Sequence, residues 1–280
     1  MAVDRKVLIT ECKDNKGLVA KVTNVCFQSG LNIIKNSEYV DNINGEFFMR
    51  TELEGDFSGI DLLKDLALAL PENSRHRLVN KGKKKLLVLV TKEAHCLGEL
   101  LIKSHYGALD AEIVAVVGNH PDLEELAQKF QLPFHFITHQ DLNRQQHEQE
   151  ILECLAGYAF DYIVLAKYMR VLSESFIAQY SNKIINIHHS FLPAFIGAKP
   201  YHQAYERGVK IIGATAHFVT NDLDDGPIIT QDVVSVDHSH SPEDMAKSGR
   251  EVEESVLTGA LRKVIEEKVI VYGNRTVVFD

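Results

Sequence analysis

The sequence predicts an α/β protein of two domains: a small α+β domain over residues 1–82, and a doubly wound, mostly parallel, Rossmann-like domain over residues 83–280. Three observations support this prediction. The first part of the chain follows the order β-α-β-β-α and closes with a strand. From Leu86 onward, apolar strands alternate with helical stretches, which is typical of a parallel sheet. A polar, basic run from Asn80 to Lys85 separates the two patterns.

The order of elements in the first domain is that of the ferredoxin-like, or split βαβ, plan. Leu18, Val22 and Val25 recur at helical spacing, and Ser29-Gly30 ends that helix. Residues Asp41–Gly45 have the composition of a hairpin turn. The expected strands are Lys6–Thr10, Asn32–Asn36, Phe47–Leu53 and one near Arg75–Val79, and the second expected helix is Ile60–Leu70.

The second domain opens with the apolar run L-L-V-L-V, which suits a strand covered on both faces. Helical stretches separate the strands that follow, as in crossover connections. The expected strands are Leu86–Thr91, Ala111–Val117, Phe134–Ile137, Asp161–Ala166, Ile184–Ile187 and Gly213–Val219. The expected helices are Cys96–Ser104, Asp122–Phe130, Arg144–Tyr158 and Pro242–Lys268, before a strand or hairpin over Val269–Phe279. The basic run between the domains is interpreted as a solvated linker, with a phosphate-binding patch as the alternative.

Composition narrows the classes of function. The 280 residues carry a net charge of −9, which disfavours a nucleic-acid partner because phosphate binding needs a basic face. The four cysteines are scattered without a C-x-x-C pair, which favours reduced thiols over a disulfide framework or a zinc site. The N-terminus has no apolar core of a signal peptide, and no segment approaches about 18 apolar residues. We therefore expect a soluble, cytoplasmic protein with no membrane partner.

The residues best suited to chemistry lie between Ile184 and Asp232. The first strand of this stretch delivers Asn186, His188 and His189 at its end. The second carries His217 and continues into polar residues that include Asp224. Ligands of open α/β sheets bind outside the carboxyl ends of the strands. An amide, an imidazole and a carboxylate that converge there predict an acid–base and oxyanion site.

Other interpretations of these residues remain open at this stage. The chain lacks G-x-G-x-x-G, Walker, G-x-S-x-G and H-E-x-x-H motifs. A metal site could draw on His188, His189, His217 and Asp224, but adjacent strand residues point to opposite faces, so we expect no metal. Ser190 is interpreted as a turn residue rather than a nucleophile. The sequence does not decide whether His189 and His217 are catalytic or structural, nor whether the carboxylates Asp222, Asp224 and Asp225 are more than ordinary loop residues.

The joint pattern is more specific than its parts. N-I-H-x-S-x-L-P from Asn186, followed by H-F-V-x-x-x-L-D-x-G-P-I-I from His217, resembles the formyltransferase family that uses 10-formyltetrahydrofolate. The resemblance covers roughly Lys85 to the C-terminus. The first domain resembles an ACT domain, through D-x-x-G-L from Asp14 and G-L-N-I from Gly30. That domain and the segment A-K-Y-M-R-V-L from Ala166 narrow the resemblance to the formyltetrahydrofolate deformylases.

The resemblance implies hydrolysis of 10-formyltetrahydrofolate to tetrahydrofolate and formate, which supplies formate for purine biosynthesis and balances one-carbon pools. Asp224 would position and deprotonate water, and Asn186 and His188 would stabilise the oxyanion. The group that protonates the leaving nitrogen is not identified. No cofactor is implied, because the folate is the substrate. The residues implied to bind the pterin are Met169, Arg170, Val171, Leu172, Thr220, Asn221 and Asp222, together with Asp224.

Two other functions remain as alternatives. The first is a formyltransferase with an amine acceptor. Glycinamide ribonucleotide enzymes of this family hold a glycine-rich phosphate loop after the first strand, whereas the segment Thr91–Gly98 has one glycine here, which favours water as the acceptor. The second is a folate sensor without catalysis, which the intact trio disfavours. The methionyl-tRNA branch is disfavoured by the acidic composition.

The resemblance also implies regulation through the first domain. ACT domains bind small amino acids where the first β–α turn of one module meets the sheet of another, which indicates Asp14, Gly17 and Asn32 as the effector site and glycine and methionine as effectors. Such a site requires a homo-oligomer, most simply a twofold one. The alternative is that Asp14–Gly17 is an ordinary turn and the domain serves only to dimerise the chain.

Overall fold

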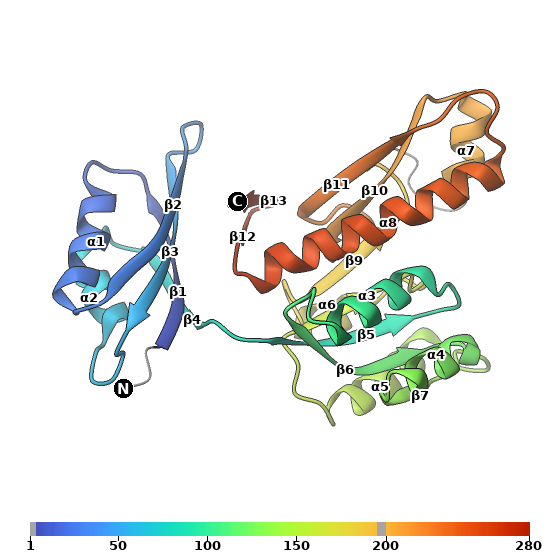
Figure 1. Cartoon of the computed structure of the whole chain (residues 1–280), viewed down its shortest axis with the longest axis horizontal. Helices are drawn as coiled ribbons and strands as arrows, with labels where there is room; N and C mark the ends of the chain where they lie inside the picture. Colours follow the sequence, from blue (N-terminus) through green and yellow to red (C-terminus); the bar gives the residue numbers. More distant parts are fainter. Residues whose placement is uncertain (1–3, 195–199) are drawn as a thin grey trace. The chain divides into compact units, whose positions relative to one another are not determined.

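The computed structural model describes residues 4–194 and 200–280. The chain divides into two compact units (Figure 1). The first unit holds the chain up to Gly82 together with residues 266–270 and 277–280, and the second holds Lys83–Ile265 and Val271–Thr276. Within the described residues, no helix is long and apolar enough to span a membrane.

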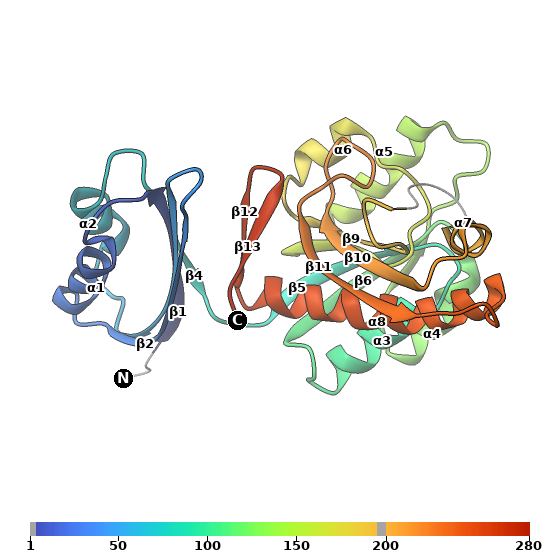
Figure 2. The same cartoon turned by 90° about the horizontal axis from the view of Figure 1, so that it is seen from above.

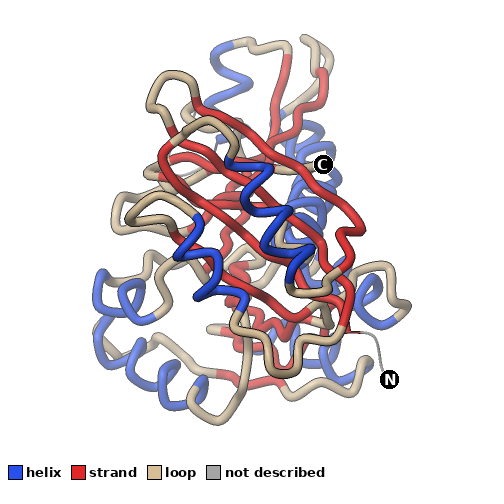
Figure 3. Tube along the Cα trace, turned by 90° about the vertical axis from the view of Figure 1, so that its left-hand side faces the viewer, coloured by secondary structure: helices blue, strands red, loops and turns tan. Residues whose placement is uncertain are grey.

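The sheet of the first unit has four strands in the order β2-β3-β1-β4, and every neighbouring pair is antiparallel. Two helices, α1 and α2, cover one face of this sheet (Figures 2 and 3). They bury Leu8 and Met49 of the strands against Val22 and Leu66 of the helices. The elements are β1 (Asp4–Lys13), α1 (Leu18–Gln28), β2 (Asn32–Asp41), β3 (Glu46–Gly55), α2 (Leu62–Ala69) and β4 (Arg75–Asn80).

Local chemistry explains where these elements begin and end. Gly17 precedes α1 with a φ of 83°, a conformation that glycine adopts without steric cost. The Asp61 side chain accepts a hydrogen bond from the Lys64 backbone N–H and so caps α2. In the β2–β3 hairpin, the Asp41 carboxylate accepts hydrogen bonds from the backbone N–H groups of Ile43 and Asn44. The observed order of elements is that of the split βαβ plan.

The end of the chain differs from the sequence prediction, which placed all of 83–280 in the second domain and extended the last helix to Lys268. Helix α8 (Pro242–Ile265) ends three residues earlier. The buried Arg50 of β3 donates to the carbonyl oxygens of Glu266 and Glu267, at 2.7 and 2.9 Å, and Glu267 is left-handed with a φ of 54°. These contacts fix residues 266–270 in the first unit. The strands β12 (Val269–Tyr272) and β13 (Arg275–Val278) follow as a hairpin.

The second unit is built on a seven-stranded sheet in the order β11-β10-β9-β8-β5-β6-β7. The strands from β7 to β9 are parallel, which confirms the predicted mostly parallel α/β sheet. Strands β10 and β11 add to it as antiparallel neighbours. The strands are β5 (Lys84–Val90), β6 (Ala111–Gly118), β7 (Phe134–Phe136), β8 (Tyr162–Leu165), β9 (Ile184–His188), β10 (Ile211–Phe218) and β11 (Ile228–Ser235).

Helices cover both faces of this sheet. On one face, Ile151 of α5 and Phe176 of α6 pack on Leu87, Leu89 and Ile163. On the other side α8 lies along β10 and β11 and beside α3 (Figure 1). The remaining elements of this unit are α3 (His95–His105), the 3₁₀ turn η1 (Pro121–Leu123), α4 (Glu124–Lys129), α5 (Arg144–Leu155), α6 (Glu174–Gln179) and α7 (Pro200–Arg207). The sequence patterns did not predict β11, α6 or α7.

Candidate active site

A cavity of about 240 Å³ lies in the second unit at the ends of β8 and β9. Three segments form its wall: residues 167–172 after β8, residues 186–189 of β9, and residues 219–224 after β10. The strand order reverses between β5 and β8, where open α/β sheets place their ligand crevice. The cavity therefore lies beside the topological switch point of the sheet.

His188 and Asp224 meet in this cavity. The imidazole Nδ1 of His188 lies 3.3 Å from Oδ1 of Asp224. His188 is 4% exposed, and its Nε2 has no hydrogen-bond partner among the described residues. Burial favours a higher pKa for Asp224, but the hydrogen bond from His188 and the electrostatic interactions with the His188 and His217 rings outweigh it and lower the pKa below its ordinary value. The carboxylate is therefore ionised at neutral pH and holds the imidazole in one orientation.

The second contact orients the side chain of Asn186. Nδ1 of His217 lies 2.9 Å from the carbonyl oxygen of Phe218, and a carbonyl only accepts, so Nδ1 carries the proton. Burial lowers the pKa of His217, which leaves the ring neutral and its Nε2 an acceptor. That Nε2 lies 3.2 Å from Nδ2 of Asn186, which donates to it. One N–H of the Asn186 amide thus donates to His217, and the second N–H is left to donate to a bound molecule in the cavity.

The route by which Asp224 reaches His188 corrects the sequence prediction. We expected both strands of this stretch to deliver their polar residues at a common carboxyl edge. Strand β10 instead runs antiparallel to β9, with Thr215 opposite His188 and His217 opposite Asn186. The loop after β10 brings Asp224 back along β9, and Asp224 itself has a φ of 56°.

Gly226 shows how closely this loop is packed. A Cβ built on Gly226 would lie 1.8 Å from the carbonyl oxygen of Phe218, so any other residue would displace the loop. The backbone N–H of Phe218 in turn donates to the carbonyl of Pro227. The G-P dipeptide after Asp225 therefore fixes the return of the chain that carries Asp224.

The predicted pterin-binding residues all line the cavity. This wall consists of Met169, Arg170, Val171, Leu172, Thr220, Asn221 and Asp222. Asp225, by contrast, is exposed and lies outside the lining. Ser190 is 3% exposed, and its hydroxyl donates to the carbonyl of Ala194, which agrees with the turn role predicted for it.

The candidate effector residues lie in the first unit. Asp14 and Gly17 are in the exposed turn between β1 and α1, and Asn32 is the exposed first residue of β2. The backbone N–H of Asp14 donates to the carbonyl of Gly45. The regulatory role of these three residues stays a prediction.

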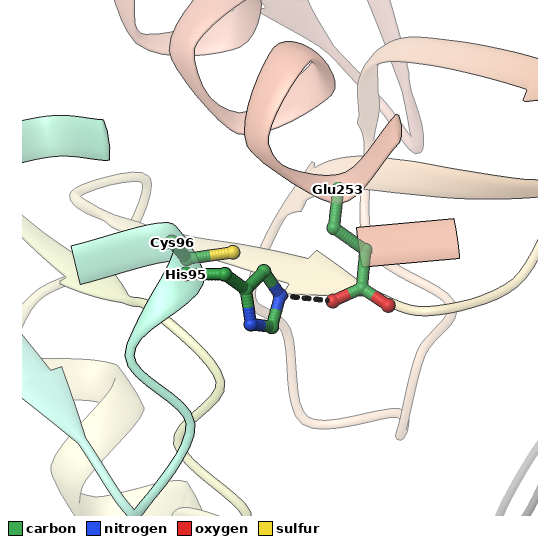
Figure 4. A group of neighbouring side chains, drawn as sticks. All are labelled: His95, Cys96 and Glu253. Carbon is green, nitrogen blue, oxygen red and sulfur yellow. Dashed lines mark hydrogen bonds and ion pairs between the residues drawn. The ribbon is translucent and has the colours of Figure 1, made fainter. Parts of the chain in front are cut away.

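Sequence reasoning missed a buried group of charges behind the cavity, which we call the Glu253 cluster: His95, Lys167, Tyr201 and Glu253. Glu253, in the middle of α8, is fully buried. Its Oε2 lies 2.8 Å from Nε2 of His95 and 3.1 Å from Nζ of Lys167, and its Oε1 accepts a 2.6 Å hydrogen bond from the Tyr201 hydroxyl. Figure 4 shows Glu253 extending from α8 toward His95 at the start of α3. Lys167 also lines the cavity.

The pKa values of this region follow from the cluster. Burial alone would raise the pKa of Glu253, but His95, Lys167 and Tyr201 together lower it to about 2. Burial and the Lys167 charge lower the pKa of His189, in the cavity wall, to about 4. His189 is therefore neutral at pH 7, beside a lysine whose charge is held by a buried carboxylate.

The donor set of this cluster suits an ion pair better than a metal. Among the described residues, one group of three potential metal ligands converges, namely His95, Cys96 and Glu253. These are not the residues of the metal site weighed from the sequence. Burial raises the pKa of the Cys96 thiol well above its ordinary value, so it is protonated and a weak ligand. The Oε2 of Glu253 already accepts from His95 and Lys167, so the lysine supplies the cation of this site.

Comparisons with known proteins identify relatives of this chain. The family described as formyl transferase matches residues 84–261. The chain is also 57% identical to the formyltetrahydrofolate deformylase of Escherichia coli (strain K12) over 277 residues, which cover 99% of each chain. This chain belongs to the formyl transferase family. A further family member, the formyltetrahydrofolate deformylase of Bacillus subtilis (strain 168), is 43% identical over 99% of this chain and 94% of its own length.

Solved structures of the family show the same relationship. A formyltetrahydrofolate deformylase from Pseudomonas syringae pv. tomato matches with a TM-score of 0.93 and 39% identity, over 100% of this chain and 95% of its own. A glycinamide ribonucleotide transformylase from Symbiobacterium toebii matches with a TM-score of 0.68 and 29% identity, over 71% of this chain and 95% of its own. The first match includes both units, whereas the second leaves more than a quarter of this chain outside the likeness.

Proposed function

We propose that this chain hydrolyses 10-formyltetrahydrofolate to tetrahydrofolate and formate. The substrate follows from the relatives, which share 57% identity over 99% of both chains and are named for this reaction. The structural observation that supports the reaction is the pairing of His188 with Asp224 at the cavity, with Nε2 of His188 unpartnered. Hydrolysis of a formyl amide needs a group that handles the proton of water and donors for the oxyanion, and this pair with Asn186 supplies both.

Each member of the trio has a role that its contacts support. Asp224 is ionised, so it can orient the water molecule and take up its proton. Asn186 keeps one N–H for the oxyanion because His217 holds the other. The buried Nε2 of His188 faces no competing partner among the described residues, and it donates to the same oxygen when the ring carries a proton on both nitrogens. Donors held in place before the reaction stabilise the developing charge without reorganisation, and each is typically worth about 10²–10³ in rate.

The folate itself would bind against the two segments that flank the trio. The pterin would lie between Met169–Leu172 and Thr220–Asp224, where polar backbone groups border exposed apolar side chains such as those of Met169 and Val171. A site with apolar walls and a few convergent polar groups is typical of a small-molecule pocket. We propose no cofactor and no metal, since the trio supplies the acid–base and electrostatic groups that water addition requires.

The test is formate release from 10-formyltetrahydrofolate by the pure full chain. The reaction is run without any amine and after treatment with a chelator. We expect stoichiometric formate and tetrahydrofolate at an undiminished rate. No release in the absence of an amine would instead indicate a formyltransferase, and tight folate binding without turnover would indicate a sensor. A rate that disappears with the chelator and returns with a metal would overturn the metal-free mechanism.

We further propose that the first unit is an ACT-type regulatory module in a twofold homo-oligomer, with glycine and methionine as effectors. The observed split βαβ order supports this, together with the left-handed Gly17 in the first turn, where backbone N–H groups can approach a ligand carboxylate. The exposed carboxylate of Asp14 offers a partner for the ammonium of an amino acid. A cytoplasmic location is also proposed, since all four cysteines are unpaired.

A further inference from the structure

Lys167 has an unusual conformation for its position. It follows β8 with a φ of 60°, which a side chain other than glycine rarely adopts, and it is 4% exposed. A buried lysine also gives up its hydration. Both costs are tolerated only where the surrounding structure holds the residue in place, and such positions cluster at functional sites. The position of Lys167 in the cavity wall therefore calls for a functional explanation.

The surroundings hold the ammonium group of Lys167 beside the carboxylate of Glu253. Nζ lies 3.1 Å from Oε2 of the fully buried Glu253. The same Oε2 also contacts Nε2 of His95, and Oε1 accepts a hydrogen bond from the Tyr201 hydroxyl. Glu93, at the turn between β5 and α3, adds a second and more distant carboxylate, 3.9 Å from Nζ. With these partners fixed, Lys167 can leave the cavity wall only by breaking its ion pair with the buried Glu253.

The place of Lys167 in the cavity identifies what it acts on. The pterin segments and the trio form most of the wall. The other polar side chains of the lining are Lys167, Tyr168, His189 and His217. The ring of Tyr201 lies 6.2 Å from the ring of His189. A nucleophile that attacks a formyl carbon held by the trio must use the space that these side chains leave.

We infer that Lys167, held by the Glu253 cluster, restricts the acceptor in this cavity to water. This inference rests on the proposed function and names its acceptor specificity. A positive charge in the wall disfavours an acceptor that arrives as an ammonium ion, and the bulk of the lysine and His189 occupies the volume that an amine would need. Water carries no charge and needs the least space.

The two possible reactions differ only in the nucleophile. With water, the oxygen bonds to the formyl carbon, the carbon–N10 bond breaks, N10 takes a proton, and formate and tetrahydrofolate leave with release of a proton. With an amine, nitrogen forms the new bond, the same bond to N10 breaks, and the amine loses the proton that N10 gains. The products are then an N-formyl amine and tetrahydrofolate. The ratio of the two formyl products therefore measures acceptor choice directly.

The experiment uses the full chain and glycinamide as the amine probe. The variant Lys167→Gly with Glu253→Gln removes both charges and opens the wall, and glycine suits the φ of 60°. The variant Lys167→Met with Glu253→Gln removes the charges but keeps the volume. A matched control removes the exposed pair of Glu125 and Lys129 through Glu125→Gln with Lys129→Met. Formate and N-formylglycinamide are quantified together for each protein.

We expect the parent chain and the control to yield formate alone. The glycine double variant should give a fraction of N-formylglycinamide at least about tenfold above the detection limit, below which the parent lies, and the methionine variant a smaller fraction. Formate release by the parent without glycinamide tests the proposed function separately. An unchanged product ratio in the glycine variant, when it turns over, overturns the inference. If that variant does not fold, an unchanged ratio in the methionine variant overturns it.

Discussion

The Nδ1 atom of His188 lies 3.3 Å from Oδ1 of Asp224, while its Nε2 has no partner among the described residues and lies in the wall of a cavity. One side of the imidazole is therefore fixed by a carboxylate and the other is free for a substrate. The two residues come from β9 and from the loop after β10, and they meet because that loop returns along β9. The predictions about catalysis follow from this contact.

Replacing Asp224 with Asn should reduce formate release by about 10²–10⁴, because the amide keeps the shape but cannot take a proton. Folate binding, measured by calorimetry, should change little. The matched control is Asp225→Asn, since Asp225 is adjacent, exposed and outside the cavity wall. A near-normal kcat for Asp224→Asn would remove Asp224 from the mechanism.

His217 is expected to act through Asn186 as a positioning residue. Replacing His217 with Phe removes the acceptor for Nδ2 of Asn186 and should lower kcat by about 10- to 100-fold, with a small change in KM. Asn186→Ala alone should cost about 10²–10³ in kcat.

The two changes together separate positioning from general damage. In the Asn186→Ala background, His217→Phe should have little further effect on kcat, because the amide that it orients is gone. Additive losses in the double variant would show that His217 acts independently of Asn186.

Glu253 should make the second unit sensitive to acid. Its pKa is lowered to about 2 in the folded chain, from an ordinary value of 4.5. A carboxylate whose folded pKa is depressed stabilises the fold fully above the unfolded pKa and loses that contribution as pH falls from about 4.5 toward 2. At pH 7, Glu253→Gln should therefore be less stable than the parent by about 3–5 kcal/mol, since Lys167 is left unpaired.

The quantity to measure is the difference in the free energy of unfolding between the parent and Glu253→Gln. Denaturant unfolding of the parent and of Glu253→Gln is followed from pH 7 downward, and the difference in the free energy of unfolding should shrink below about pH 4.5. The pKa of His189 is lowered to about 4, so both proteins should also lose stability as pH falls from about 6.5 toward 4, because the unfolded ring takes up a proton first. If the difference in the free energy of unfolding between the two proteins stayed constant across the acid range, the ion pair between Lys167 and Glu253 would be contradicted.

Much of the secondary structure of the second unit was predictable because it depends on the pattern of neighbouring residues in the sequence. Apolar runs such as Leu86–Val90 are buried on both faces, and they marked the parallel strands. The direction of β10 was not predictable, because alternation of side chains is the same in parallel and antiparallel strands. The Lys167–Glu253 pair was not predictable either, because the spacing of residues far apart in the sequence does not indicate which charged side chains meet. The end of α8 was missed because the two residues that follow it bond to Arg50 of β3, which lies far away in the sequence.

Arg50 offers a test of the first unit. Its guanidinium is 2% exposed and bonds to the carbonyls of Glu266 and Glu267 and to the carboxylate of Glu52. Arg50→Ala should destabilise the fold by about 3–5 kcal/mol, because it leaves buried acceptors without donors. The control Arg5→Ala breaks an exposed pair with Glu54 and should cost about 0–1 kcal/mol. Equal unfolding midpoints for the two variants would show that the Arg50 contacts contribute nothing.

The regulatory proposal is tested by titration of glycine and methionine against formate release by the full chain. We expect each to change the rate, with a coupling free energy of about 1–3 kcal/mol to the catalytic site. Asp14→Ala should weaken the response, because the ammonium of the effector loses its partner, and the rate without effector should stay the same. The control Glu72→Ala changes an exposed carboxylate of the same unit outside the proposed site. If neither amino acid alters the rate or binds by calorimetry, the unit is not regulatory, and a twofold oligomer by light scattering would then indicate a dimerisation element.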